Sequence, residues 1–260
     1  MRAVGIILAG GNNNRMKELT HKRAVAAMPI AGSYRSIDFA LSNMTNSHIQ
    51  KVAVLTQYNA RSLNEHLNSS KWWNFGRKQG GLYVFTPTIT NDNGYWYRGT
   101  ADAIYQNMDF LKKSHEPYVV IASGDAVYKM DYSKVLQYHI DKKADVTVVC
   151  KEMDPSDDVS RFGTIRMDDD MRITEFEEKP MVTKSNMIST GIYVIRRRLL
   201  IDLIEHAAEE ERFDFVNDVL IRYKNLKKIY GYKIDHYWSN IATVDAYYKT
   251  NMDFLKPEVR

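Results

Sequence analysis

The sequence contains little that would crosslink, anchor or export the chain. Cys150 is the only cysteine among 260 residues, which excludes an internal disulfide and fits a reducing compartment. No segment reaches the roughly 18 apolar residues of a membrane span. The apolar run at the N-terminus ends at Gly10 and Gly11, so it is too short for a secretory signal. We therefore expect a cytoplasmic protein.

Repeats, low-complexity linkers and metal-ligand patterns are also missing. The seven histidines show no ligand spacing, so a structural zinc site is not expected. The formal net charge of +4 is modest for this length and does not indicate nucleic acid binding. The chain is 44% hydrophobic and 26% charged, as in ordinary globular proteins, and no change of composition marks a boundary. We predict one domain over residues 1–260.

What the sequence does contain is an alternation of strand and helix patterns. Short apolar runs predict buried strands at residues 2–8, 51–56, 118–122 and 144–149, and helical spacing appears at residues 36–46, 60–67 and 100–113. A hairpin is predicted at residues 163–167 and 173–177, followed by strands at 191–195 and 227–234 with two helical stretches between them. This order predicts an α/β fold, with a mostly parallel, Rossmann-like sheet flanked by helices.

The first strand leads into a loop with the features of a phosphate-binding turn. After Leu8, the pair Gly10 and Gly11 allows the backbone to turn sharply, so that amide N–H groups can face an anion. Asparagines follow at positions 12–14, and asparagine tolerates left-handed backbone, but each now carries a Cβ atom. We interpret this loop as a nucleotide-binding loop with several altered positions.

Three later segments carry further candidate ligands. Gly99 lets the backbone approach a planar ring closely, and Thr100 is a candidate N-cap for the helix that follows. Asp125 follows a buried strand, at the sheet edge where ligands bind in open α/β folds, and a carboxylate there suits Mg²⁺. Glu178 offers a carboxylate to sugar hydroxyls, and Lys179 offers an ammonium group to a phosphate.

Together with residues 237–247, which lead into the last helix, these segments closely resemble the glucose-1-phosphate adenylyltransferases, the ADP-glucose pyrophosphorylases of glycogen and starch synthesis. The resemblance covers essentially the whole chain and is most specific at residues 34–43, 96–103, 124–125 and 128–132. It implies a nucleotidyltransferase domain that converts ATP and glucose 1-phosphate to ADP-glucose and pyrophosphate with Mg²⁺. Such in-line phosphoryl chemistry asks the protein mainly for positioning and charge neutralisation.

The resemblance assigns roles to residues that match the family pattern. Arg15 matches the loop arginine that contacts the nucleotide phosphates, which makes it the catalytic candidate. The implied nucleotide-binding set is Leu8, Gly10, Gly11, Arg15, Tyr97, Gly99 and Thr100. Asp125 matches the first metal-binding aspartate. Glu178 and Lys179 match the pair that recognises glucose and its phosphate.

Other positions depart from the family pattern. Asn13 and Asn14 replace a glycine and a threonine, Met16 replaces a leucine, Val25 an active-site lysine, Ser239 an arginine, and Asn240 the second metal-binding aspartate. Losing one preorganised electrostatic group costs about 10²–10³-fold in rate. Three such losses at one site predict little turnover, with Mg²⁺ binding weak or lost. Asn240 can still offer a carbonyl oxygen.

This pattern of losses is similar to the D-type regulatory subunit of bacterial glycogen biosynthesis, which pairs with a catalytic subunit. It implies a catalytically weak or inactive chain that binds ATP or ADP-glucose and glucose 1-phosphate and regulates a catalytic partner in a hetero-oligomer. The alternative is an active glucose-1-phosphate adenylyltransferase, because Arg15, Asp125 and Lys179 remain. The C-terminal left-handed β-helix of the family has no counterpart before Arg260.

Three remaining motifs have both a structural and a functional interpretation. Asp168-Asp169-Asp170 could hold a metal-bound sugar nucleotide in a glycosyltransferase, but acidic residues also favour turns, which is the interpretation we prefer. Arg196-Arg197-Arg198 is interpreted as the solvated start of a helix rather than an anion site. Trp72 and Trp73, with Phe75, are interpreted as local packing or an interface patch rather than a ligand wall.

Overall fold

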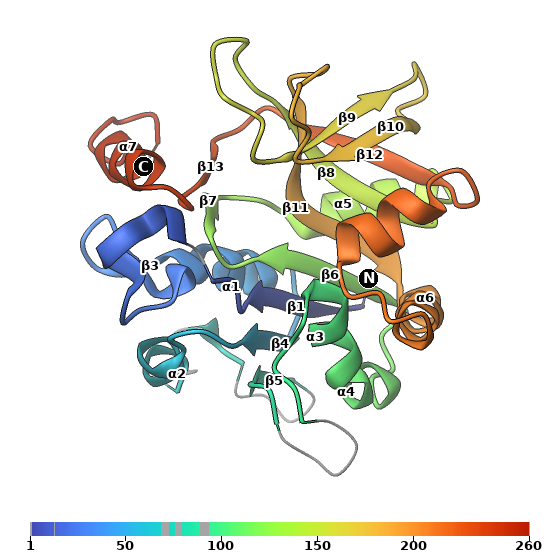
Figure 1. The fold of residues 1–260 in the computed structure, drawn as a ribbon, viewed down its shortest axis with the longest axis horizontal. Coiled ribbons are helices and arrows are strands. Elements are labelled where there is room, and N and C mark those ends of the chain that lie inside the picture. The colour runs from blue at the N-terminus through green and yellow to red at the C-terminus, as the bar shows by residue number, and fades with distance from the viewer. Residues whose placement is uncertain (1, 13, 69–72, 76–79, 89–93, 260) are drawn as a thin grey trace. The chain divides into compact units, whose positions relative to one another are not determined.

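The computed structural model describes residues 2–12, 14–68, 73–75, 80–88 and 94–259 (Figure 1). The chain divides into two compact units. Unit 1 comprises Met1–Ala3, Tyr97–Ile121 and Ser133–Asp235, and unit 2 comprises Val4–Trp96, Ala122–Tyr132 and His236–Arg260. One domain over residues 1–260 stays a prediction, since compactness alone does not show that either unit folds independently.

Unit 2 is built on parallel strands. Almost all of β1 (Ala3–Ala9) belongs to it and pairs in parallel with β4 (Lys51–Thr56), which pairs in parallel with β5 (Gly81–Phe85) (Figure 1). The helices α1 (Ser36–Asn46) and α2 (Arg61–Leu67) follow β3 and β4 along the chain. Gly5 has no room for a side chain, because a Cβ atom there would lie 2.9 Å from the sulfur of Met44 on α1. Helix α1 therefore packs closely on β1.

Short elements complete unit 2. The 3₁₀ helices η1 (Asn14–Thr20) and η2 (Val25–Ala27) follow the first loop, and β2 (Pro29–Ile30) pairs with β3 (Tyr34–Arg35). Strand β7 (Ala126–Tyr128) pairs in antiparallel fashion with β13 (Trp238–Asn240), which precedes α7 (Val244–Asp253). This last pairing joins segments that are far apart in the sequence.

Unit 1 has a sheet of mixed direction. Its strands are β8 (Val146–Glu152), β9 (Gly163–Met167), β10 (Ile173–Glu178), β11 (Met187–Arg196) and β12 (Ile229–Ile234), together with most of β6 (Tyr118–Ser123). Strand β11 is antiparallel to β6, β8 and β9, while β12 is parallel to β8.

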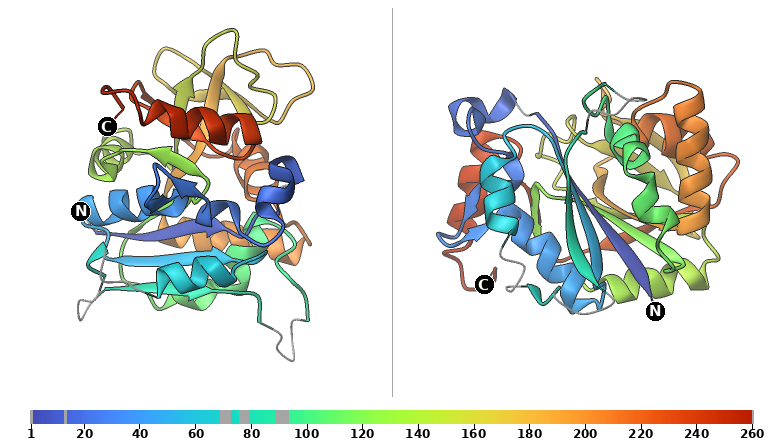
Figure 2. Two further views of the ribbon diagram at one scale, coloured as in Figure 1. Left: turned by 90° about the vertical axis from the view of Figure 1, so that its left-hand side faces the viewer. Right: turned by 90° about the horizontal axis from the view of Figure 1, so that it is seen from below.

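The helices of unit 1 are α3 (Thr100–Gln106), α4 (Met108–Lys112), most of α5 (Tyr132–Asp141), α6 (Arg197–Glu209) and the π-helix η4 (Phe215–Ile221). The right-hand view of Figure 2 shows the green helices α3 and α4 beside the orange helix α6. An ion pair of 2.6 Å between Lys112 and Glu205 joins α4 to α6. This packing places the end of α6 near the start of α3.

The predicted fold class, α/β with a mostly parallel sheet and helices alongside, is confirmed. The strands predicted at residues 51–56 and 163–167 and the helix predicted at 36–46 have the predicted bounds. The helix predicted over residues 100–113 breaks at Asn107, whose backbone leaves the helical region at φ −112° and ψ 23°. The Asn107 side chain donates to the Ala103 carbonyl at 2.9 Å, as asparagine does when it competes with helical bonding.

The three ambiguous motifs have structural roles. Asp168 accepts backbone N–H bonds from Asp170 and Arg172 at 3.0 and 2.9 Å, which confirms the turn interpretation. Arg197 begins α6 but is not simply solvated, because its guanidinium donates to two backbone carbonyls, of Leu111 and Glu116. Trp73 and Phe75 are buried, which fits packing, and Trp72 lies outside the described residues. Within the described part of the chain, no helix combines the length and apolar character needed to cross a membrane.

Candidate functional site

The first loop leaves β1 in unit 2 without the left-handed glycines that a sharp turn would favour. Neither Gly10 nor Gly11 has a positive φ, and among the described residues of this segment a positive φ occurs at Lys17, at 50°. A Cβ atom on Gly10 would lie 3.3 Å from the Cβ of Gln57, whereas one on Gly11 would meet nothing within 4 Å. Gly10 is therefore restricted by a neighbouring residue, and Gly11 faces open space.

The three residues of η1 that the family pattern singles out differ in their exposure. Arg15 is exposed, as is Asn14 at the start of η1. Met16 is fully buried. Asn13 lies outside the described residues. The loop thus presents an arginine to solvent and anchors itself through the methionine beside it.

Asp125 lies beside the end of β1. The N–H of Gly124 donates to the Leu8 carbonyl at 2.9 Å, and the Gly124 carbonyl accepts from Ser36 at the same distance. The Asp125 carboxylate accepts a bond of 2.5 Å from the Ser123 hydroxyl and is half-buried. Asp125 is therefore held at the sheet edge, next to the loop, as the strand-end pattern predicts.

Asn240 is brought next to Asp125 by the pairing of β13 with β7. Asn240 lies opposite Ala126 in this ladder, and the N–H of Ile241 donates to the backbone carbonyl of Asp125 at 2.9 Å. The side-chain oxygen of Asn240 accepts the N–H of Ala242 at 3.0 Å. The amide oxygen thus already accepts one hydrogen bond, and the amide nitrogen is not a ligand for Mg²⁺.

The described residues around Asp125 do not form a cluster of metal-binding side chains. Among the residues that the structure describes, no three or more histidine, cysteine, aspartate or glutamate side chains gather to hold a metal ion. Asp125 supplies one carboxylate, and the neighbouring position supplies an amide whose oxygen already accepts a hydrogen bond. These residues do not fit a cation site built on two carboxylates.

Val25 belongs to a buried apolar cluster in unit 2 rather than to a polar surface. The cluster consists of Met16, Val25, Met28, Ile30, Val127 and Ile241. Val25 is only 7% exposed. Two of the positions that depart from the family pattern, Met16 and Val25, thus pack in the same cluster. That cluster also contains Ile241, the residue directly after Asn240.

Ser239 is directed at α7. Its hydroxyl lies 2.7 Å from the hydroxyl of Thr250, which is fully buried and donates to the Ala246 carbonyl. The neighbouring Tyr237 donates to Asp253 at 3.2 Å. Burial raises the pKa of Tyr237 to about 12, and the Asp253 carboxylate adds to the rise. Ser239 therefore takes part in a polar contact between β13 and α7.

In unit 1, the residues predicted to line the nucleotide pocket have partners of their own. Thr100 is not the N-cap of α3, because that position is Gly99, and the Thr100 hydroxyl instead accepts the N–H of Phe215 at 2.9 Å. The close approach at Gly99 is to the protein itself, since a Cβ atom there would lie 2.7 Å from the Phe213 carbonyl carbon. Tyr97 is buried, which raises its pKa, and its hydroxyl accepts a bond from Asn107.

Glu178 and Lys179 lie together at the end of β10. Their side chains form an ion pair of 2.9 Å, in which the Glu178 side chain is 14% exposed and the Lys179 side chain 59%. Lys179 has a left-handed backbone with φ 47°. The ammonium group therefore remains open to solvent while the carboxylate is largely enclosed.

Two polar residues near Glu178 were not predicted. Burial raises the pKa of Tyr193, and the carboxylates of Glu178 and Asp214 raise it further. Asp214 follows helix α6 rather than a strand, so a search for polar residues at strand ends does not find it. Tyr193 lies within the buried strand β11, where sequence predicts core packing.

The apolar cluster makes a specific prediction for Val25. Val25→Lys should lower the free energy of unfolding by about 3 kcal/mol or more, because it places an ammonium group among buried apolar side chains. Urea denaturation measures the change. The matched control is Val182→Lys, at a position 75% exposed, which should change stability by less than about 0.5 kcal/mol. Equal stability of the two variants would contradict the core assignment of Val25.

Comparisons with known proteins agree with this fold. A family model described as nucleotidyl transferase matches residues 4–257. The chain is 42% identical over 255 residues to the glucose-1-phosphate adenylyltransferase of Clostridium novyi, with 97% of this chain and 66% of the relative covered. It is 40% identical over 256 residues to that of Thermosipho melanesiensis, with 98% of this chain and 62% of the relative covered.

A third relative, the glucose-1-phosphate adenylyltransferase of Bacillus anthracis, is 42% identical over 260 residues, with 99% of this chain and 69% of the relative covered. The chain thus spans between 62% and 69% of the length of these relatives. The resemblance inferred from the sequence motifs is confirmed. The chain is a member of the nucleotidyl transferase family and, within it, of the glucose-1-phosphate adenylyltransferase family.

Proposed function

We propose that this chain is an ADP-glucose pyrophosphorylase-like subunit of glycogen biosynthesis that is catalytically weak or inactive and regulates a catalytic partner. The observation that carries the proposal is Asn240 beside Asp125, with its side-chain oxygen bonded to the Ala242 N–H. By family resemblance this position holds the second metal-binding aspartate. An amide there removes one negative charge from the cation site, so Mg²⁺ binding is weak or lost.

The other replacements support a loss of catalysis rather than a single tolerated exchange. Val25 replaces a lysine charge with a side chain of the apolar cluster, and Ser239 replaces an arginine charge with a hydroxyl bonded to Thr250. Each lost electrostatic group costs about 10²–10³-fold in rate, although the costs of coupled groups do not add simply. Both new side chains have contacts of their own, as expected for a site no longer selected for turnover.

Binding can outlast catalysis in this arrangement. In unit 2, the Leu8–Gly11 backbone and the exposed Arg15 are proposed to contact the nucleotide. In unit 1, the turn at Gly99 is assigned to nucleotide binding by the family resemblance. The pair Glu178–Lys179 is the proposed site for glucose 1-phosphate, with the solvent-exposed ammonium group available to its phosphate. We therefore propose that this chain binds ATP or ADP-glucose, together with glucose 1-phosphate.

The alternative function is that of an active glucose-1-phosphate adenylyltransferase. It is favoured by the name that the relatives carry and by the retention of Arg15, Asp125 and the Glu178–Lys179 pair. In that case Asp125 would be the carboxylate ligand of the cation, together with the nucleotide phosphates. The two functions differ in whether the purified chain releases pyrophosphate.

A pyrophosphate-release assay separates them. With ATP, glucose 1-phosphate and Mg²⁺, the chain alone should release pyrophosphate at least about 10³-fold more slowly than a catalytic homologue assayed beside it. Asn240→Asp should raise the rate, because it restores a carboxylate next to Asp125, while the matched variant Asn240→Ala should not. Rapid release by the unaltered chain would overturn the proposal in favour of the active enzyme.

The regulatory role has its own test. A catalytic paralogue from the same organism, produced together with this chain, should co-purify with it and should change its rate or its response to effectors. Asn240→Ala should regulate as well as the unaltered chain, because the proposed regulation does not use turnover by this subunit. A partner that neither co-purifies nor changes its kinetics would contradict the hetero-oligomer.

A further inference from the structure

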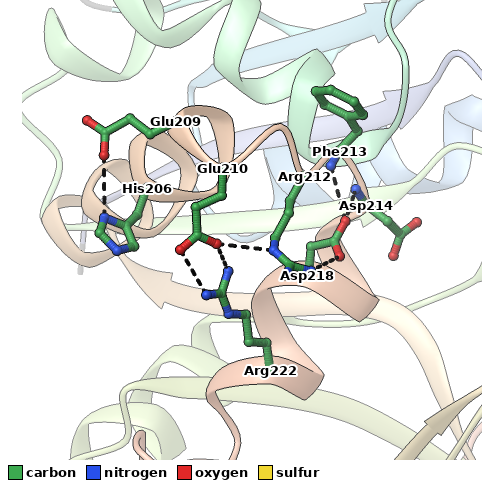
Figure 3. Close-up of polar contacts among 8 residues, drawn as sticks. All are labelled: His206, Glu209, Glu210, Arg212, Phe213, Asp214, Asp218 and Arg222. Carbon is green, nitrogen blue, oxygen red and sulfur yellow. Dashed lines mark hydrogen bonds and ion pairs between the residues drawn. The ribbon is translucent and has the colours of Figure 1, made fainter.

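The connection between α6 and η4 is folded back on the side chain of Asp218. One carboxylate oxygen of Asp218 accepts the N–H groups of Phe213 and Asp214, at 3.1 and 2.9 Å (Figure 3). The Asp214 side chain caps η4 by accepting the N–H of Asn217 at 2.7 Å. Because the acceptor is charged, these bonds are stronger than those between neutral groups. The backbone at Phe213 is therefore held firmly from one side.

The other side of the same residue contacts the start of α3. The Phe213 carbonyl accepts the N–H of Ala101 at 2.8 Å and that of Asp102 at 3.3 Å. These are two of the first N–H groups of α3, which have no partner within their own helix. Gly99, the N-cap, lies so close to this carbonyl that it has no room for a Cβ atom.

Two further contacts connect the same segments. The N–H of Phe215 donates to the Thr100 hydroxyl at 2.9 Å. The guanidinium of Arg98 lies 3.8 Å above the centre of the Phe213 ring and donates to Asp102 at 3.2 Å, a residue that is 3% exposed. The turn at residues 97–100 is thus fixed by the α6–η4 connection rather than by its own sequence neighbours alone.

We infer that Asp218 is a positioning residue for the turn at residues 97–100, acting through the backbone of Phe213. Its carboxylate orients the Phe213 backbone, and the Phe213 carbonyl in turn sets the start of α3. The assignment of an adenine nucleotide or ADP-glucose as the ligand of this turn rests on the proposed function. The contacts between Asp218, Phe213 and α3 do not.

The ion pairs around Asp218 provide a matched control. Glu210 bonds both Arg222 and Arg212, and Arg212 lies 3.5 Å from Asp218 (Figure 3). These side chains are about a third or more exposed, apart from Asp218 at 22%. Exposed pairs of this kind contribute little to stability. Arg222 belongs to the same charged cluster, but its bonds are to Glu210 and none joins it to Phe213 or Asp214.

Hydrogen exchange tests the coupling without any ligand. Asp218→Ala should accelerate exchange of the Ala101 and Asp102 amides about tenfold, because the Phe213 carbonyl loses its orientation. Asp218→Asn retains an oxygen for both N–H groups, so it and Arg222→Gln should exchange these amides within about twofold of the unaltered chain. If Asp218→Ala does not fold, Asp218→Ser replaces it, since its shorter hydroxyl cannot accept both bonds. Unchanged exchange at Ala101 and Asp102 in a folded Ala or Ser variant would overturn the inference.

Calorimetric titration with ADP-glucose then tests the functional part. Asp218→Ala should raise the Kd about tenfold, whereas Asp218→Asn and Arg222→Gln should stay within about twofold. If the unaltered chain binds neither ADP-glucose nor ATP, the proposed function fails, while the exchange result still decides the coupling. Faster exchange with an unchanged Kd would overturn the role of Asp218 in ligand binding.

Discussion

The candidate site of unit 2 depends on the pairing of β13 with β7. These two short strands come from distant parts of the sequence, and their ladder sets Asn240 opposite Ala126 and bonds Ile241 to the Asp125 backbone. Because side chains alternate along a strand, Ser239 and Asn240 point to opposite sides of this ladder. Ser239 meets Thr250 of α7, and Ile241, just beyond the strand, enters the apolar cluster with Val25. One backbone pairing thus connects positions at which the chain departs from its family.

This connection gives the departures a common physical character. The family resemblance assigns to these positions charges that neutralise phosphates and hold a cation, whereas this chain has an amide engaged in a local turn, a hydroxyl bonded to α7 and a valine in a core. Each replacement removes a group that catalysis would need to keep preorganised. Each also gains contacts within unit 2. The loop that we propose to bind the nucleotide carries an exposed Arg15, in keeping with the proposed division between binding and turnover.

Much of this fold could be predicted from the sequence, because long apolar runs and periodic helices carry local signals. Strand β4 and helix α1 have their predicted bounds. Strands β7 and β13 have three residues each and depend on a distant partner, so no local pattern reveals them. Which side chains pack against a given residue is likewise not revealed by a local pattern. The family pattern identifies Val25 as a replacement, but only the fold shows that it packs in one cluster with Met16.

The turn at residues 97–100 is a second example of contacts that a single sequence does not reveal. Gly99 and Thr100 were predicted from a general preference for glycine near ligands and threonine at N-caps. The structure gives both residues partners on the α6–η4 connection, more than a hundred residues later in the sequence. The N-cap prediction for Thr100 is therefore wrong, because the N-cap is Gly99, and the role of this segment in nucleotide binding stays a prediction. A single sequence offers no signal for such a distant contact.

We propose that the residue at position 240 decides how well this chain holds a cation with its nucleotide. Mn²⁺, which also prefers oxygen ligands, allows a direct measurement by electron paramagnetic resonance in the presence of a non-hydrolysable ATP analogue. The account predicts that the unaltered chain binds the Mn²⁺–nucleotide no more tightly than Asn240→Ala does. Asn240→Asp should bind it about tenfold more tightly. Binding by the unaltered chain as tight as that of Asn240→Asp would contradict the account.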